Sequence, residues 1–337
     1  MEESRVLGQQ HIVRHFENAI QMGKISHAYI LNGETGSGKM RLAMNFAKAL
    51  QCEQNDPFKE RIPGVACNEC KSCKQTESKN QPDIKYITYE KSGIGVDEIR
   101  TQINNDIDIK PYSSRYKVYI VPESEKMTVA AQNALLKTIE EPPEYAVIIL
   151  LTTNADSFLP TILSRCVLLN MKPVKEELIK NQLMAGYGIG EYDAKVAAIF
   201  SAGNPGKAVK LATSEDFQDL KKCIVGTLFS LKTGGMDVVS NKVKEATEFK
   251  KVINEYMALM RSWFRDVLMY KATKNEEAII FQEEVRSVEE MAEDCSFFDL
   301  DIILKSIDQA ENRVRSNVNF ELTIEVLLLA IKERIQK

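Results

Sequence analysis

The sequence has no surplus of basic residues, which limits what it can bind unaided. Lys and Arg total 44 against 48 Asp and Glu, and the formal net charge is −4 at pH 7. Neutralisation of phosphates by Lys and Arg supplies most non-specific affinity for nucleic acid. The charge balance therefore disfavours a protein that grips duplex DNA by itself, and any DNA contact is expected to be local or shared with partners.

The sequence also lacks any long apolar run. No stretch reaches the ~18 apolar residues of a membrane span, and Met1–Gly8 lacks the apolar region of a signal peptide. We therefore expect no membrane association and a cytoplasmic location. No repeat or low-complexity segment is present, and 44% hydrophobic with 27% charged residues is typical of a globular protein. A chain of 337 residues is long enough for two or three domains.

Histidine is scarce, whereas cysteine is clustered. Cys67, Cys70 and Cys73 follow one another with two residues between them, Cys52 lies upstream, and none of the three histidines is near. A disulfide framework is not expected in a reducing compartment. Four thiolates that converge tetrahedrally form a closed structural zinc site, so this cluster predicts zinc, with free surface thiols as the alternative. The remaining cysteines are expected in the core: Cys166, Cys223 and Cys295.

Apolar periodicity divides the chain into an α/β part and a helical part. Up to Met171, strand-like and helix-like segments alternate, which predicts a parallel sheet covered by helices on both faces. The expected strands are 27–31, 84–89, 117–121, 146–152 and 166–171, and the expected helices are 9–22, 41–52, one from 96, and 129–140. Beyond Lys172 only helical patterns remain, short at 174–184, 192–201 and 206–212, and longer at 245–270 and 322–335.

A glycine-rich segment follows the first expected strand. Gly33-Glu-Thr-Gly-Ser-Gly-Lys39 fits the P-loop pattern G-x-x-x-x-G-K and lies between a strand and a helix, as the pattern requires. The glycines Gly33, Gly36 and Gly38 let backbone N–H groups approach a phosphate, and the helix N-terminus adds positive potential. We therefore expect an ancestry in nucleotide binding rather than a plain turn, while retention of a nucleotide stays open.

Two positions near this loop lack the residues that bind magnesium. The residue after Lys39 is normally Ser or Thr, but here it is Met40, whose thioether is a poor ligand for a hard cation. The second ligand should be an Asp at the end of a later strand, where Pro122 stands. Glu123 could orient a water molecule, but it has no metal-bound phosphate to serve. We therefore expect no ATPase activity from this chain alone.

Two longer motifs follow. One is Asn133-Ala-Leu-Leu-Lys-Thr-Ile-Glu-Glu-Pro-Pro143, and the other is Ser164-Arg-Cys166. They resemble the subunit signature and the SRC motif of the bacterial DNA polymerase III clamp-loader family, whose members have the AAA+ fold. The cysteine module inserted after the P-loop helix, at about residues 52–80, and the segments Val6-Leu-Gly-Gln9 and His27-Ala-Tyr29 are similar to that family too. The resemblance covers most of residues 1–170.

The resemblance implies three domains and a set of partners. Residues 1–171 would form the AAA+ α/β domain, 172–213 a small helical lid, and 214–337 a helical collar that joins other subunits. The implied partners are the gamma/tau and delta subunits and, through the complex, the sliding clamp and primer-template DNA. An apolar stripe near the C-terminus could serve the collar or the domain's own core: Ile324, Leu327, Leu328, Ile331 and Ile335.

The lid and the SRC motif decide which kind of subunit is implied. ATPases of the family carry an arginine in a G-x-x-R setting, whereas this chain has Gly203-Asn-Pro-Gly206 and so resembles a non-hydrolysing subunit. Arg165, between Ser164 and Cys166, is implied as an arginine finger for a neighbour's γ-phosphate, with a surface salt bridge as the alternative. For Lys137 and Glu140, packing and contact with a neighbour both stay open.

Two other functions stay open. A gamma-like ATPase that tolerates Met40 and Pro122 would hydrolyse ATP steadily as the isolated chain. A zinc-dependent nucleic-acid-binding module would show a strongly salt-dependent affinity for DNA as a monomer, although the acidic charge balance disfavours it.

Overall fold

The computed structural model describes residues 6–54, 65–90, 92–316 and 318–336. It divides into two compact units, each described by itself. The first holds Met1–Tyr187 and Ser201–Ala208, and the second holds Gly188–Phe200 and Val209–Lys337. Residues 55–64 of the expected cysteine module lie outside the described residues.

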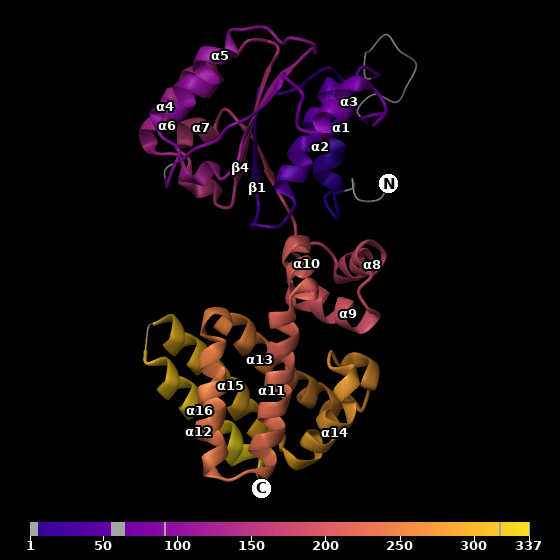
Figure 1. Cartoon of the computed structure of the whole chain (residues 1–337), viewed down its shortest axis with the longest axis vertical. Coiled ribbons are helices and arrows are strands. Elements are labelled where there is room, and N and C mark those ends of the chain that lie inside the picture. Colours follow the sequence, from indigo (N-terminus) through magenta and orange to yellow (C-terminus); the bar gives the residue numbers. More distant parts are fainter. Residues whose placement is uncertain (1–5, 55–64, 91, 317, 337) are drawn as a thin grey trace. The chain divides into compact units, whose positions relative to one another are not determined.

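A five-stranded parallel sheet forms the centre of the first unit (Figure 1). Its strands are β1 (Ala28–Asn32), β2 (Ile84–Tyr86), β3 (Lys117–Val121), β4 (Ala146–Thr152) and β5 (Val167–Asn170). Their spatial order is β2-β3-β4-β1-β5, so β1 lies between β4 and β5. β3 and β4 are buried throughout, as strands covered on both faces should be. The expected parallel α/β sheet is confirmed.

Successive side chains of a strand point to opposite faces, so the sheet has two apolar cores. Tyr29 and Leu31 of β1 face the core that α1 and α2 cover, and Ala28 and Ile30 face the core that α4 to α7 cover. The covering helices on the first face are α1 (Gln10–Gln21) and α2 (Lys39–Gln51). Those on the second are α4 (Val96–Ile99), α5 (Asn105–Ile107), α6 (Val129–Glu140) and α7 (Pro160–Leu163), with a π-helical turn at Arg100–Asn104 joining α4 to α5.

The edge strand β2 is shorter than the expected strand 84–89. Beyond Tyr86, the backbone of Thr88 is hydrogen-bonded to a side chain: its N–H donates to Gln102 Oε1 at 3.0 Å, and its carbonyl accepts from Gln102 Nε2 at 2.7 Å. Thr88 faces away from β3, because the preceding residue, Ile87, is the one whose N–H donates to the Ile120 carbonyl of β3, at 2.9 Å. The next residue of β3 that would donate back to this strand is Pro122, which has no N–H, so the pairing ends there.

The three short helices expected after Lys172 are present. They are α8 (Glu176–Tyr187), α9 (Glu191–Phe200) and α10 (Pro205–Thr213). α9 packs within the second unit, where Tyr192 donates to Glu284 at 2.9 Å and Asp193 pairs with Lys221 at 3.3 Å. α8 and the turn at Ser201–Ala208 belong to the first unit.

The second unit is otherwise a bundle of six further helices within the described residues. They are α11 (Glu215–Thr233), α12 (Met236–Glu248), α13 (Ile253–Thr273), α14 (Val285–Asp294), α15 (Phe297–Arg315) and α16 (Phe320–Ile335). The single helix expected over 245–270 is wrong, because α12 ends at Glu248 and a 3₁₀ turn, Lys250–Val252, precedes α13. No residue between Ala246 and Tyr256 is buried, and the two helices, which both contact α11, make most of their contacts with different partners, α12 with α16 and α13 with α14 and α15.

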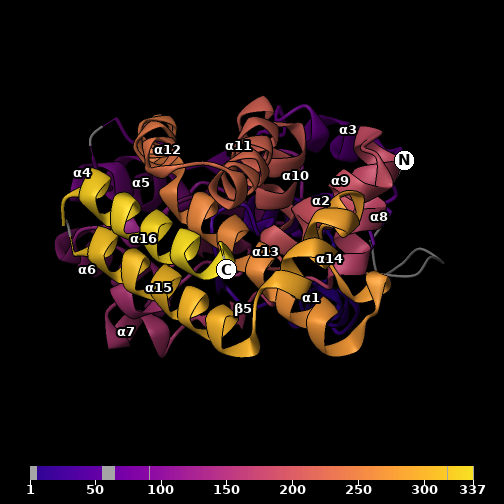
Figure 2. The same ribbon diagram turned by 90° about the horizontal axis from the view of Figure 1, so that it is seen from below.

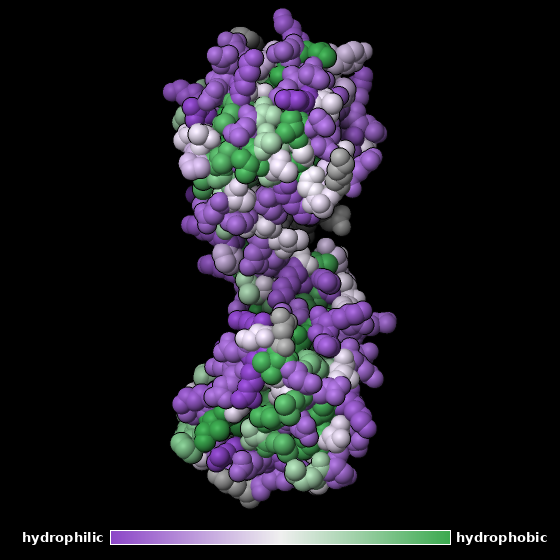
Figure 3. All heavy atoms as spheres, turned by 90° about the vertical axis from the view of Figure 1, so that its left-hand side faces the viewer, coloured by the Kyte–Doolittle hydropathy of each residue, from purple (hydrophilic) through white to green (hydrophobic). Residues whose placement is uncertain are grey.

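α15 and α16 lie side by side in this bundle (Figure 2). The apolar stripe of α16 is core, because its five residues are between 0% and 3% exposed: Ile324, Leu327, Leu328, Ile331 and Ile335. Other apolar side chains remain on the surface, including Leu322 at 55% and Val326 at 41% exposure. Figure 3 shows apolar side chains gathered on one face of this unit. Within the described ranges, no helix is both long and apolar enough to span a membrane.

Candidate functional site

The P-loop connects β1 to α2 at the edge where β1, β3 and β4 end. Gly36 and Gly38 have φ angles of +88° and +96°, a left-handed conformation that glycine adopts without a steric penalty. Gly38 is the N-cap of α2, so the loop leads directly into a helix N-terminus. This arrangement is the one that presents backbone N–H groups to a phosphate.

Lys39 is turned back onto its own loop. Its Nζ donates to the carbonyl oxygens of Gly33 and Glu34, the second at 2.8 Å. Burial lowers the pKa of Lys39 and outweighs the opposing effect of the carboxylates of Glu125 and Glu34. The ammonium group of Lys39 is therefore hydrogen-bonded to carbonyl oxygens of its own loop. It could turn away from them toward an incoming anion.

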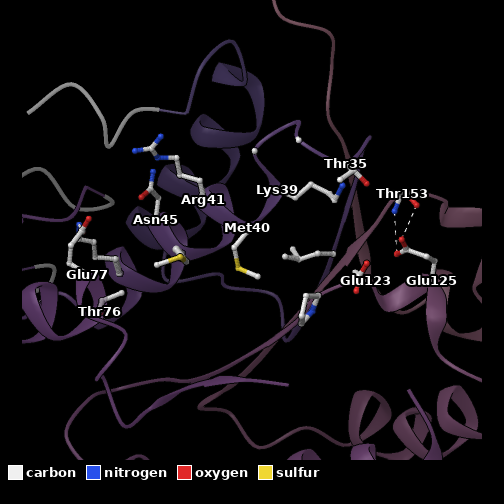
Figure 4. Close-up of a pocket in the computed structure, with 16 residues that line it drawn as sticks. Thr35, Lys39, Met40, Arg41, Asn45, Thr76, Glu77, Glu123, Glu125 and Thr153 are labelled. Carbon is white, nitrogen blue, oxygen red and sulfur yellow. Dashed lines mark hydrogen bonds and ion pairs between the residues drawn. The ribbon is translucent and has the colours of Figure 1, made fainter. Parts of the chain in front are cut away.

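A cavity of about 600 Å³ opens beside the P-loop (Figure 4). Met40 and Met44 of α2 line it together with Pro122 and Leu151 from the ends of β3 and β4. Thioether and hydrocarbon groups do not bind magnesium, which requires hard oxygen ligands. The two positions at which the P-loop pattern predicts magnesium ligands thus belong to the apolar part of the lining.

Two carboxylates in the lining of this cavity, those of Glu123 and Glu125, are hydrogen-bonded to other residues of the first unit. Glu123, with a φ of +46°, accepts hydrogen bonds from Tyr89 Oη and from Lys126 Nζ, the latter at 3.0 Å. Both hydrogen bonds lower the pKa of Glu123. Glu125 accepts from the hydroxyl and the N–H of Thr153 at 2.8 and 3.3 Å (Figure 4). No sequence motif pointed to Glu125, although its position two residues after Glu123 could have identified it as a second carboxylate of this cavity.

The turn Gly203–Gly206 lies directly on the P-loop. The N–H of Gly206 donates to the carbonyl of Gly36 at 3.0 Å, and Asn204 Nδ2 donates to the carbonyl of Thr35 at 2.8 Å. A Cβ on residue 206 would lie 2.7 Å from the carbonyl oxygen and 2.8 Å from the Cα of Gly36. Glycine is therefore needed at 206 for this contact. No sequence motif indicated that the side chain of Asn204 would hydrogen-bond to the P-loop.

The four cysteines of the inserted module come together between the end of α2 and α3 (Lys71–Glu77). The Sγ atoms of Cys52, Cys67, Cys70 and Cys73 all lie within 4.8 Å of one another. The Sγ atoms of Cys67 and Cys73 are 3.9 Å apart. A tetrahedral zinc with Zn–S bonds of about 2.3 Å separates its sulfurs by about 3.8 Å. The donor set and its spacing therefore fit a four-thiolate zinc site.

Backbone N–H groups support negative charge on these sulfurs. Cys70 N donates to Cys67 Sγ at 3.3 Å, and Cys73 N donates to Cys70 Sγ at 3.4 Å. Burial opposes ionisation of Cys67, but the N–H groups of Glu69 and Cys70 and the neighbouring thiols lower its pKa to about 7. Burial raises the pKa of Cys52 and Cys73, and a bound cation would favour their thiolate forms.

Arg165 lies after α7, apart from the P-loop cavity lining. Its guanidinium pairs with Glu140, the last residue of α6, at 2.9 Å. Nη1 also donates to the carbonyl of Thr161 at 3.1 Å and to Ser164 Oγ at 3.3 Å. The Arg165 side chain is 40% exposed, so part of it remains accessible. Cys166 packs against the core that α6 and α7 cover, and burial raises the pKa of its thiol to about 12.

Comparison with known proteins places these features in a family. Residues 8–175 match the family model "DNA polymerase III, delta subunit", and residues 239–333 match "DNA polymerase III, delta subunit, C terminal". DNA polymerase III subunit tau of Bacillus subtilis is 30% identical over 95% of this chain and 60% of its own length. DNA polymerase III subunit delta' of Bacillus subtilis is 26% identical over 96% of both chains.

A solved structure is similar as well. The gamma subunit-related protein of DNA polymerase III from Thermotoga maritima is 22% identical, with a TM-score of 0.41, over 96% of this chain and 99% of that one. The two matching family models, the relatives along the whole chain and the motifs at the P-loop and Arg165 agree with one another. The chain belongs to the bacterial DNA polymerase III clamp-loader family.

Proposed function

We propose that this chain is the delta-prime subunit of a DNA polymerase III clamp loader, an AAA+ subunit without ATPase activity of its own. The observation that carries the proposal is the P-loop cavity, where Lys39 is kept but Met40 and Pro122 offer no ligand for magnesium. Gly206, in the place of the lid arginine of family ATPases, agrees with it. So does the similarity to a delta-prime subunit over 96% of both chains.

A gamma-like ATPase is the second candidate. The 30% identity to a tau subunit favours it, although this chain spans only 60% of that relative. The two candidates differ in a simple assay, because only the gamma-like protein would hydrolyse ATP as the isolated chain.

The proposed role implies an assembly. The chain would join the gamma/tau and delta subunits and, through the complex, act on the sliding clamp and primer-template DNA in the cytoplasm. Residues 1–171 would serve as the AAA+ domain, 172–213 as the lid and 214–337 as the collar. Because the buried stripe of α16 is core, exposed apolar residues such as Leu322 and Val326 are better candidates for collar contacts.

The cysteine cluster would hold one structural zinc ion. Cys52, Cys67, Cys70 and Cys73 supply four ligands, which leaves no open position for catalysis. The ion would join the end of α2 to α3, next to the ion pair between the buried Lys48 and the exposed Glu77. Zinc would thus stabilise one wall of the P-loop cavity.

Arg165 gives the non-hydrolysing subunit a part in hydrolysis. An arginine supplied by a neighbour stabilises charge on the γ-phosphate oxygens and is worth ~10³–10⁵ in rate in GTPase examples. Guanidinium stays charged and pairs with phosphate through two N–H groups, whereas lysine is a point charge. Arg165, partly exposed at the end of α7, could reach a phosphate bound by the adjacent subunit.

Arg165→Ala in the reconstituted complex tests this role. Folding, zinc content and assembly should be unchanged, while ATP hydrolysis with clamp and primed DNA should fall partially, since only the ATP site facing this subunit loses its arginine. Arg165→Lys should restore little of the activity. Wild-type turnover by an Arg165→Ala complex of confirmed composition would leave Arg165 as a structural residue.

A further inference from the structure

The guanidinium of Arg165 is already held in place by its own chain. Its Nη2 contacts Glu140 Oε1 at 2.9 Å, and its Nη1 contacts the carbonyl of Thr161 and the hydroxyl of Ser164 at 3.1 and 3.3 Å. These partners come from the end of α6 and from α7, which pack together in the first unit (Figure 1). The position of the guanidinium is therefore coupled to both helices.

The contacts leave part of the guanidinium unused. A guanidinium has five N–H donors in a planar fork, and three of them are taken by these contacts. Two donors remain, which is the number that a bidentate contact with phosphate requires. The intramolecular partners can therefore stay in place while Arg165 binds a neighbour's phosphate.

Stability alone does not explain Glu140. Its side chain is 46% exposed and that of Arg165 is 40% exposed, and ion pairs so open to solvent contribute little to stability. Glu140 is also the last residue of α6, where the partial negative charge of the helix terminus disfavours a carboxylate. Glu140 is therefore unfavourable for the end of α6, yet it pairs with Arg165. Its effect on the position of Arg165 explains its presence better than helix stability does.

Resting on the proposed role of Arg165 as an arginine finger, we propose that Glu140 is its positioning residue. The carboxylate orients the guanidinium so that its free edge faces the adjacent subunit before that subunit's ATP site closes on it. An unrestrained arginine side chain samples many rotamers. Glu140 removes much of this freedom in advance, which lowers the barrier for hydrolysis in the neighbouring site.

The test uses the full chain in the complex with gamma/tau and delta subunits of the same organism, with clamp and primed DNA. We define the Arg165-dependent turnover as the ATP hydrolysis that disappears in Arg165→Ala. Glu140→Ala should lower this part about tenfold in kcat with an unchanged KM for ATP, because misplacement acts on the transition state. Glu140→Gln, whose amide oxygen still accepts from Nη2, should keep most of it. Glu144→Ala, which removes an exposed carboxylate nearby, should match wild type.

A double variant separates positioning from a general structural effect. If Glu140 acts through Arg165, Glu140→Ala should cause no further loss in an Arg165→Ala background. Wild-type or increased turnover in Glu140→Ala, alongside a loss in Arg165→Ala, would overturn the positioning role and leave the finger intact. If Glu140→Ala lowered ATP turnover by the same factor in the wild-type and Arg165→Ala backgrounds, the positioning role would be overturned too. An Arg165→Ala complex that is fully active would instead reject the proposed function itself.

Discussion

Replacement of Gly206 by alanine is the most direct test of how the P-loop is held. The added Cβ would lie 2.7 Å from the carbonyl oxygen and 2.8 Å from the Cα of Gly36. Both atoms belong to the backbone of the P-loop, so neither can swing aside as the end of a side chain could. The turn at Gly203–Gly206 must therefore move away from the loop.

Three hydrogen bonds between the turn and the P-loop break in that movement, and they set the magnitude. They are Gly206 N–H to the Gly36 carbonyl at 3.0 Å, Asn204 Nδ2 to the Thr35 carbonyl at 2.8 Å and Asn204 Nδ2 to Glu34 Oε2 at 3.2 Å. At about 1 kcal/mol each, breaking them costs about 3 kcal/mol. The helix preference of alanine returns up to about 1 kcal/mol. A net destabilisation of about 2 kcal/mol is expected, with the melting temperature lowered by about 4–8 °C.

Thermal unfolding followed by circular dichroism measures the global effect, and hydrogen exchange of the amide at residue 206 measures the local one. Protection of that amide should fall by more than about tenfold. Gly226→Ala is the matched control, because Gly226 lies within α11 with nothing within 4 Å of the added Cβ. It should stabilise the protein by up to about 1 kcal/mol. A Gly206→Ala protein with wild-type stability and wild-type protection at residue 206 would refute the reasoning.

Three further outcomes are expected. Chelator-washed protein should retain about one zinc per chain, and a folded protein free of metal would contradict the four-thiolate site. The isolated chain should show no ATP turnover, and turnover that vanishes in Lys39→Ala would favour the gamma-like alternative. Burial opposes ionisation of Asp106, but hydrogen bonds from Lys117 and Tyr119 prevail and hold its pKa below the usual range. This carboxylate therefore stabilises the folded state above the ordinary pKa of Asp, and the contribution is lost as pH falls through the lowered value. The urea concentration at the unfolding midpoint should therefore fall less between about pH 5 and about pH 3 in Asp106→Asn than in wild type. Equal acid sensitivity of the two proteins would count against the ion pair between Asp106 and Lys117.

The sequence by itself determined the features that depend on local pattern. Continuous apolar runs such as 146–152 predicted buried parallel strands, and the spacing of Gly33, Gly36, Gly38 and Lys39 predicted a P-loop between strand and helix. The spacing of Cys67, Cys70 and Cys73 predicted a thiol cluster, which the structure forms with Cys52. These predictions succeed because the signal and the structure involve the same few consecutive residues.

Only the tertiary structure decided the features that join distant residues. Periodicity did not reveal the break between α12 and α13, because that break follows from packing against different helices. Nor did it show that Gly206 touches Gly36, far away in the chain, or that Glu140 pairs with Arg165. A side chain's partner across the fold depends on how whole elements pack, and no local pattern encodes that choice. The sequence therefore identified the chemical groups of the site, and the packing of α6, α7 and the turn at Gly203–Gly206 determined what each group contacts.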